Sequence, residues 1–153
     1  MNACDRETLR LASIDDVPEL VSLLAELFTQ EADFSPQPER QRRALVQILT
    51  TSNYGRIWVA ECDGHCIGMV SLLETVSTAE GGPAVWLEDF IVSKTFRGMG
   101  IGGRLLEAAL GDCRERGITR VTLLTDRDNA SAKRMYARHG FTESAMLPLR
   151  RYL

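Results

Sequence analysis

The chain has 153 residues and a formal net charge of −3, from 18 Lys and Arg against 21 Asp and Glu. This length suits a single domain over residues 1–153 and excludes a cofactor domain joined to a separate substrate domain. The mildly acidic, mixed charge argues against a nucleic-acid partner, because nonspecific binding needs concentrated positive charge. No window approaches the ~18 apolar residues of a membrane span, and no signal peptide or lipidation motif is evident. We therefore expect a cytoplasmic protein with no membrane partner.

The cysteines and histidines do not form a metal-binding pattern. The four cysteines show no CxxC spacing, and the histidines are His65 and His139 alone. We therefore expect no metal cofactor. Both histidines fall at a turn or a helix end, and neither is assigned to catalysis.

Apolar periodicity predicts two helices and a hairpin in the first half of the chain. Residues 8–12 suit a first strand. Helical spacing of apolar residues from Val17 to Phe28 predicts an amphipathic helix. Two prolines break the chain before a shorter helix over residues 40–49. Strands over 56–61 and 66–76 flank Asp63-Gly64, which favours a hairpin turn.

The second half alternates strands and helices. Residues 84–92 (AVWLEDFIV) are the most strand-like run and carry two carboxylates in the middle. An amphipathic helix follows a glycine cluster and ends at Gly117, and residues 120–125 suit a buried strand. Asn129 is expected to cap a helix that ends near His139 and Gly140, and residues 141–153 suit one or two strands. This order predicts an α+β fold with a mainly antiparallel sheet and one βαβ crossover.

The glycine cluster lies between the strongest strand and a helix. Its glycines let backbone N–H groups point toward one place, and the helix N-terminus adds partial positive charge, so the segment suits a pyrophosphate. Arg97 and Lys94 can meet phosphates from the side. The spacing also fits a dinucleotide fingerprint with Asp126 downstream, but only one strand–helix–strand unit follows, whereas that fold needs several. A glycine-rich turn without a ligand is the third interpretation. The cluster is Arg97, Gly98, Met99, Gly100, Ile101, Gly102 and Gly103.

On the basis of this glycine cluster, the sequence resembles the GNAT superfamily of acyl-CoA-dependent N-acetyltransferases. Its signature Arg/Gln-x-x-Gly-x-Gly/Ala matches Arg97 to Gly102. A second signature matches Asn129, Tyr136 and Gly140-Phe141, with the small residue between them shifted. The resemblance covers nearly the whole chain. It implies a twisted, mixed and mainly antiparallel sheet of six to seven strands flanked by about four helices, acetyl-CoA as co-substrate, and a primary amine as acceptor.

The segment Leu87-Glu-Asp-Phe-Ile-Val92 is similar to the diamine (spermidine/spermine) acetyltransferase branch. That resemblance implies that Glu88 deprotonates the amine and that Tyr136 protonates the leaving thiolate. An amine with a pKa near ~10.4 is mostly protonated at neutral pH and needs such a base. A salt-bridged Glu88 and a core Tyr136 are the alternatives. Strand alternation is expected to place Asp89 on the opposite face.

The family also implies where the co-substrate lies. The backbone of Phe90, Ile91 and Val92 is expected to pair with pantetheine, with Asn129 facing the same arm. Lys133 on the last helix contacts the 3′-phosphate in one interpretation and lies on a solvated face in the other.

The acceptor is expected to contact Phe28, Glu31, Trp86 and Glu88. Acidic and aromatic residues between the first two helices suit a cationic amine, although a solvated acidic loop explains them equally well. Core packing is the alternative for Trp86. A diamine, an amino acid, another small amine and a protein amine remain open as acceptors, as do a non-catalytic acyl-CoA-binding module and a nucleotide-binding interaction protein. We also expect a homodimer, because such domains often pair through late strands and the tail carries the apolar segments 146–149 and 152–153.

Overall fold

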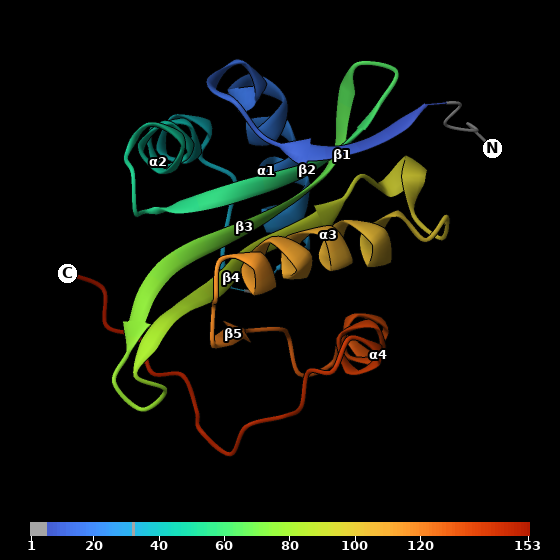
Figure 1. The fold of residues 1–153 in the computed structure, drawn as a ribbon. Coiled ribbons are helices and arrows are strands. Elements are labelled where there is room, and N and C mark those ends of the chain that lie inside the picture. The colour runs from blue at the N-terminus through green and yellow to red at the C-terminus, as the bar shows by residue number, and fades with distance from the viewer. Residues whose placement is uncertain (1–5, 32) are drawn as a thin grey trace.

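A single five-stranded sheet organises the computed structural model, which describes residues 6–31 and 33–153 (Figure 1). The strands lie in chain order across the sheet. Strands β1 to β4 pair antiparallel, and β5 pairs parallel with β4. The strands are β1 (Glu7–Leu11), β2 (Gly55–Cys62), β3 (His65–Ser77), β4 (Gly82–Val92) and β5 (Arg120–Leu123).

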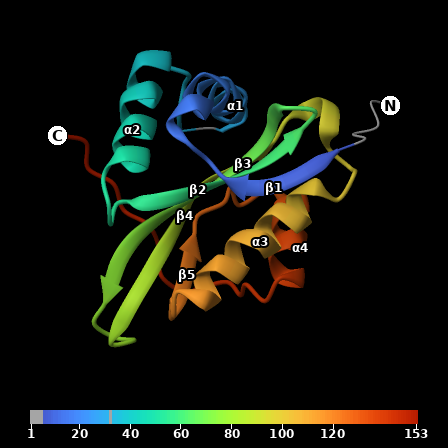
Figure 2. The same cartoon turned by 45° about the horizontal axis from the view of Figure 1, so that its top comes forward.

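Two pairs of helices cover the two faces of the sheet (Figure 2). One apolar cluster joins α1 and α2 to Ile57, Val59, Met69 and Ile91. The other joins α3 and α4 to the opposite face. The helices are α1 (Val17–Gln30), α2 (Pro38–Thr50), α3 (Ile101–Glu115) and α4 (Ala130–Arg138), and the 3-10 turns are η1 (Ile14–Asp16) and η2 (Lys94–Phe96). No helix in the described part of the chain is long and apolar enough to cross a membrane.

Local signals placed most of these elements correctly, so the α+β class, the mixed sheet and the four helices are confirmed. Asn129 caps α4 by accepting the N–H of Ala132 at 3.1 Å. Gly117 and Gly140 end their helices at positive φ, +70° and +85°. Pro38 opens α2 at its first turn, where a missing N–H costs nothing, instead of breaking the chain before it.

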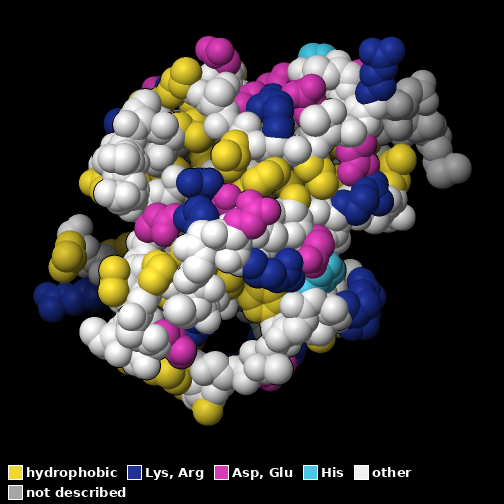
Figure 3. Space-filling view, in the orientation of Figure 1, with side chains coloured by type: hydrophobic (Ala, Val, Ile, Leu, Met, Phe, Trp, Pro, Cys, Tyr) yellow, Lys and Arg dark blue, Asp and Glu magenta, His cyan; other side chains and the backbone are white. Residues whose placement is uncertain are grey.

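The predicted number of strands is wrong. The structure has five strands in its described residues rather than six to seven, and residues 141–153 form an extended tail without regular pairing. A strand needs a partner, and the open edge of β5 offers only four residues. Pro148 within the tail also lacks the N–H that a ladder requires. The tail arcs away from the sheet, and the space-filling view is hollowed inside that arc (Figure 3).

Candidate active site

A β-bulge on β4 carries the two carboxylates of the LEDF segment. Val70 pairs with Phe90 and Leu72 with Leu87, so the single residue Ser71 on β3 faces two residues, Glu88 and Asp89. The Ser71 hydroxyl accepts the N–H of Asp89 at 3.0 Å and donates to its carboxylate at 3.1 Å. These two bonds take the place of ladder bonds that the bulge interrupts. The serine therefore fixes the position of Asp89.

The bulge also changes which side chains face which layer. Val85 and Leu87 pack toward α3, as do Phe90 and Val92, whereas Ile91 packs toward α1. An unbroken strand would put residues 85, 87, 89 and 91 on one face. The extra residue interrupts the simple alternation from which opposite faces were expected for Glu88 and Asp89, and their facing stays a prediction. Asp89 is satisfied by Ser71, while Glu88 is exposed.

Strands β4 and β5 part at the bulge. Their register runs from Ala84 paired with Arg120 to Leu87 paired with Leu123, and the described chain makes no β5 pairing beyond it. Residues 88–92 therefore have no strand partner among the described residues on their β5 side. Phe90, Ile91 and Val92, predicted to meet pantetheine, occupy this open edge.

The glycine cluster forms the predicted turn into α3. Gly98 and Gly100 adopt positive φ, +79° and +77°, which L side chains rarely adopt. Gly100 is the residue before α3, and the first N–H groups of that helix have no carbonyl partner within it. A Cβ on Gly102 would lie 3.5 Å from both Phe90 and Val92, an ordinary van der Waals contact, so the first turn of α3 packs directly on β4. These features make a ready site for an anion.

The Arg97 side chain folds back on the end of β4 and stays partly exposed. Its Nε donates to the Val92 carbonyl at 2.8 Å, and its Nη2 lies 3.1 Å from a carboxylate oxygen of Glu26 on α1. The same Glu26 oxygen accepts the N–H of Lys94 at 2.6 Å. Arg97 thus links α1 to the end of β4, and its phosphate contact stays a prediction.

Tyr136 on α4 lies between two aromatic rings. Its ring centroid is 6.1 Å from that of Phe90 and 5.6 Å from that of Phe141. The ring is buried, but no residue in the described chain hydrogen bonds its hydroxyl. Burial, followed by the negative charge of Glu31, raises the pKa of Tyr136 to about 12. The hydroxyl therefore remains a proton donor at neutral pH.

Glu31, directly after α1, is the centre of an acidic cluster. Burial, followed by the nearby charges of Asp89, Asp126, Glu88 and Asp33 in that order, raises its pKa to about 7. Burial also raises the pKa of Asp89 to about 6, with Ser71 opposing and Glu88 adding to the shift. Since Glu31 also acts on Tyr136, this cluster brings together the predicted base, acid and acceptor residues.

The remaining predicted residues are not among those whose charges act on Glu31 in the acidic cluster, and their exposure and neighbours are as follows. Trp86 is 40% exposed, so it is not a core residue. Phe28 packs against Phe34 at a ring-centroid distance of 5.6 Å. Lys133 pairs with Glu143 at 2.6 Å, and its predicted phosphate contact is not shown. Met99 is partly exposed in the glycine turn.

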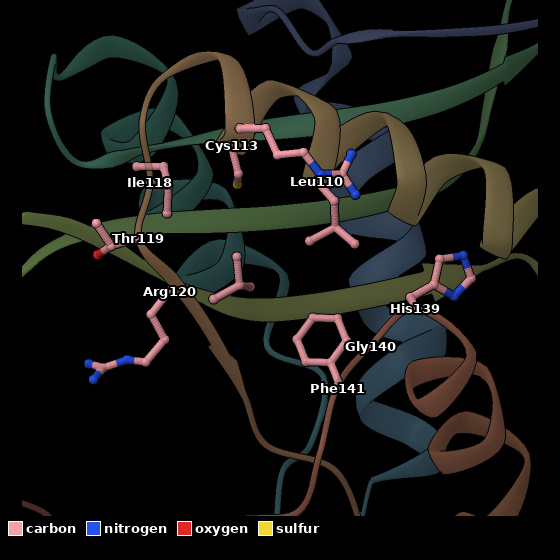
Figure 4. A pocket seen from close by; sticks show the side chains of 10 residues that line it. Leu110, Cys113, Ile118, Thr119, Arg120, His139, Gly140 and Phe141 are labelled. Carbon is pink, nitrogen blue, oxygen red and sulfur yellow. The ribbon is translucent and has the colours of Figure 1, made fainter. Parts of the chain in front are cut away.

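A separate cavity of about 240 Å³ lies behind β5, between α3 and the end of α4 (Figure 4). Leu110, Cys113, Ile118 and Phe141 give it an apolar floor, and His139 stands at one side. None of the predicted catalytic residues lines it. In the described residues, no group of three His, Cys, Asp or Glu side chains is arranged to hold a metal ion.

Comparison with known proteins identifies the family. The acetyltransferase (GNAT) family model matches residues 17–141. The chain belongs to this family. It is therefore an acyl-CoA-dependent N-acetyltransferase, and acetyl-CoA is the co-substrate of such enzymes.

Several known proteins resemble this GNAT chain along most of its length. The N-acetyltransferase YhfO of Bacillus subtilis is 30% identical over 122 residues, covering 78% of this chain and 82% of that protein. The aminoalkylphosphonate N-acetyltransferase of Salmonella typhimurium is 28% identical over 136 residues, covering 89% and 85%. The solved integron cassette protein HFX_CASS3, from a salt-marsh metagenome, superposes with a TM-score of 0.82 at 31% identity, covering 95% and 90%.

Three residues of this site were not assigned from the sequence: Ser71, Asp126 and Glu26. Ser71 stands in the apolar run IGMVSLL, where a lone serine is the available signal. Asp126 was considered only as part of a dinucleotide pattern. Glu26 lies in α1, and its bonds to the residues before the glycine turn join positions 68 and 71 residues apart, which no local pattern indicates.

Proposed function

We propose that this GNAT enzyme acetylates a small primary amine by direct transfer, with Glu88 as general base and Tyr136 as general acid. The observation that carries the proposal is the acidic cluster around Glu31. It gathers Glu88, Asp89 and the Tyr136 hydroxyl at the place where β4 and β5 part, beside the glycine turn.

The residues present fit acetyl-CoA. The turn at Gly98 and Gly100 presents backbone N–H groups at the start of α3, which suits a pyrophosphate. The open edge of residues 90–92 suits the amide groups of pantetheine, and Asn129 caps the helix that faces it. When bound, acetyl-CoA supplies an acetyl thioester for the amine to attack.

The side chains then divide the proton transfers between them. An ammonium entering the cluster meets several carboxylates, and the exposed Glu88 takes its proton, directly or through water. A backbone N–H of residues 90–92 on the open edge polarises the acyl oxygen. Tyr136, whose pKa of about 12 keeps its hydroxyl protonated, gives a proton to the departing sulfur.

Two lines of support bear on the acceptor. The LEDF segment and the acidic cluster favour a cationic amine, including the diamines of the spermidine/spermine branch. A relative is named as an acetyltransferase for aminoalkylphosphonates, which carry one amine and one anion. Amino acids and protein amines are further candidates, and a binding module without catalysis is the alternative in another class.

Thiol release from acetyl-CoA with a panel of amines tests the proposal. Glu88→Gln should lower kcat by about 10²-fold or more, because a positioned general base contributes about 10²–10⁴-fold. Glu115→Gln, an exposed carboxylate on α3, is the matched control and should leave kcat unchanged. Equal activity of Glu88→Gln and the unmodified enzyme would exclude Glu88 as the base. Thermal stabilisation by CoA without release on any amine would favour the binding module, and stabilisation by NAD alone would favour a nucleotide-binding protein.

A further inference from the structure

A second hollow lies on the acceptor side of the molecule, where the C-terminal tail meets the α1–α2 loop. This tail pocket has a volume of about 390 Å³. Three aromatic side chains, Phe28, Phe34 and Tyr152, line it together with Asp33 and Arg40. Tyr152 comes from the tail, whose end lies beside α2 (Figure 2).

The tail pocket is bordered by more positive than negative charge. Arg150 on the tail lies 5.6 Å from the Phe34 ring centroid and donates from Nη1 to Asp33 at 2.8 Å. That ion pair is exposed, and such pairs contribute little and exchange readily. Arg40 forms no ion pair with any described residue. Arg150 lies outside the residues that line the pocket, but its ion pair offsets the charge of Asp33, so Arg40 is left as the unpaired charge of the lining.

The uncharged polar groups of the pocket also favour an anion. The amide oxygen of Gln41 accepts the N–H of Gln37 at 2.6 Å, so its NH₂ group remains free to donate. Arg150 uses only Nη1 in the described contacts, which leaves Nε and Nη2 as further donors. Guanidinium groups match carboxylate and phosphonate oxygens in geometry.

Glu31 connects this pocket to the reacting end of the site. Phe28, which lines the pocket, lies in the last turn of α1, and Glu31 follows that helix directly. Glu31 experiences the charge of Asp33 from the pocket and those of Glu88 and Asp89 from the bulge. A small molecule that passes Glu31 therefore has carboxylates at one end and guanidinium groups at the other.

We propose that the tail pocket is an anion subsite, with Arg40 in its lining and Arg150 at its border, and that the acceptor is an amine with a carboxylate or phosphonate at its far end. This inference rests on the proposed acetylation of a small amine and narrows its substrate class. A diamine would place its second ammonium against Arg40 and Arg150, which is unfavourable. The pocket therefore opposes the diamine acceptor that the LEDF segment suggests.

Four amines test the subsite, each with three methylenes after the reacting nitrogen and a different terminal group: 3-aminopropylphosphonate, 4-aminobutyrate, 1,4-diaminobutane (a CH₂NH₃⁺ end) and butylamine (a CH₃ end). We expect kcat/KM for the better of the two anionic amines to exceed that for butylamine at least tenfold, and 1,4-diaminobutane to fall below butylamine. The two anionic compounds distinguish a phosphonate from a carboxylate preference. Repeating the set with two-carbon and five-carbon spacers separates a wrong length from a missing subsite.

Substitution of each arginine by a neutral residue tests whether Arg40 and Arg150 cause the preference for anionic amines. Arg40→Gln and Arg150→Gln should each reduce the preference for the anionic amine at least fivefold and leave butylamine turnover unchanged. Arg43→Gln, an equally exposed α2 arginine without an ion pair, is the control and should keep the preference. Butylamine turnover with no anionic preference at any length, or an equal loss in Arg43→Gln, overturns the subsite alone. Absence of turnover on every amine overturns the proposed function as well.

Discussion

Replacing Asp89 by Asn should stabilise the protein, and the gain should grow with pH. Burial is the largest cause that raises the pKa of Asp89 to about 6, against an ordinary value of 3.8. A carboxyl group with a raised pKa binds more protons in the folded chain than in the unfolded chain. Stability is therefore greatest below the unfolded pKa and falls as pH rises through the folded pKa. The ionised group costs about 3 kcal/mol at pH 8, since each pKa unit is worth about 1.4 kcal/mol.

Urea unfolding of the unmodified protein and Asp89→Asn from pH 5 to pH 8 measures this cost. The advantage of the variant should roughly double across that range and reach up to about 3 kcal/mol, or about 6–12 °C in Tm for a domain of this size. The new amide adds its own desolvation cost, but that cost does not vary with pH, so the slope is the decisive quantity. Glu115→Gln should show no slope. A stability difference that is flat with pH, or that shrinks toward pH 8, would refute the assigned burial of a charged Asp89.

Three further outcomes are expected. Tyr136→Phe should lower kcat about 10²-fold with little change in Tm, because the buried ring is kept and the proton donor is lost; unchanged kcat would exclude the acid role. Gly100→Ala should destabilise the protein by about 1–2 kcal/mol, since the φ of Gly100 is +77°, and it should weaken the thermal stabilisation by CoA. The control is Gly111→Ala inside α3, where a Cβ meets no other atom, and it should instead stabilise the protein by up to about 1 kcal/mol. Leu149 on the tail is almost fully exposed, and we predict that light scattering will show a homodimer of two 17.0 kDa chains. Leu149→Asp should convert this dimer to a monomer, and an unmodified protein that is monomeric at all concentrations would contradict the predicted dimer.

The features that sequence predicts well here are local ones. The turn into α3 needs positive φ at two positions, and glycine stands at both. Asn129 caps α4 through a bond to a residue three positions on. The bulge is different, because AVWLEDFIV read alone is an unbroken strand. The interruption becomes visible only when β4 is paired with β3, where Ser71 faces two residues instead of one.

The acceptor side shows the same limit more strongly. The tail was predicted as strand from its apolar residues, yet pairing depends on what lies beside it. Instead, Arg150 reaches an aspartate 117 residues earlier in the chain. No local pattern indicates that ion pair. The acidic residues of the loop can therefore be recognised in the sequence, but the basic residues that border the tail pocket cannot. The sequence therefore favoured a diamine, and the three-dimensional arrangement favours an amine with an anion.

The acidic cluster also implies that amine binding releases protons. Glu31, with a pKa of about 7, is close to half protonated at pH 7, partly because neighbouring carboxylates repel its charge. A bound ammonium offsets that repulsion, lowers the pKa and favours ionisation. Calorimetric titration of butylamine into the CoA complex, in buffers of different ionisation enthalpy, should therefore show release of up to about half a proton at pH 7 and less at pH 8. Glu31→Gln should abolish most of the release. Proton uptake, or release unchanged in that variant, would mean that the amine does not bind beside Glu31, and the cluster would then lose its role as the acceptor site.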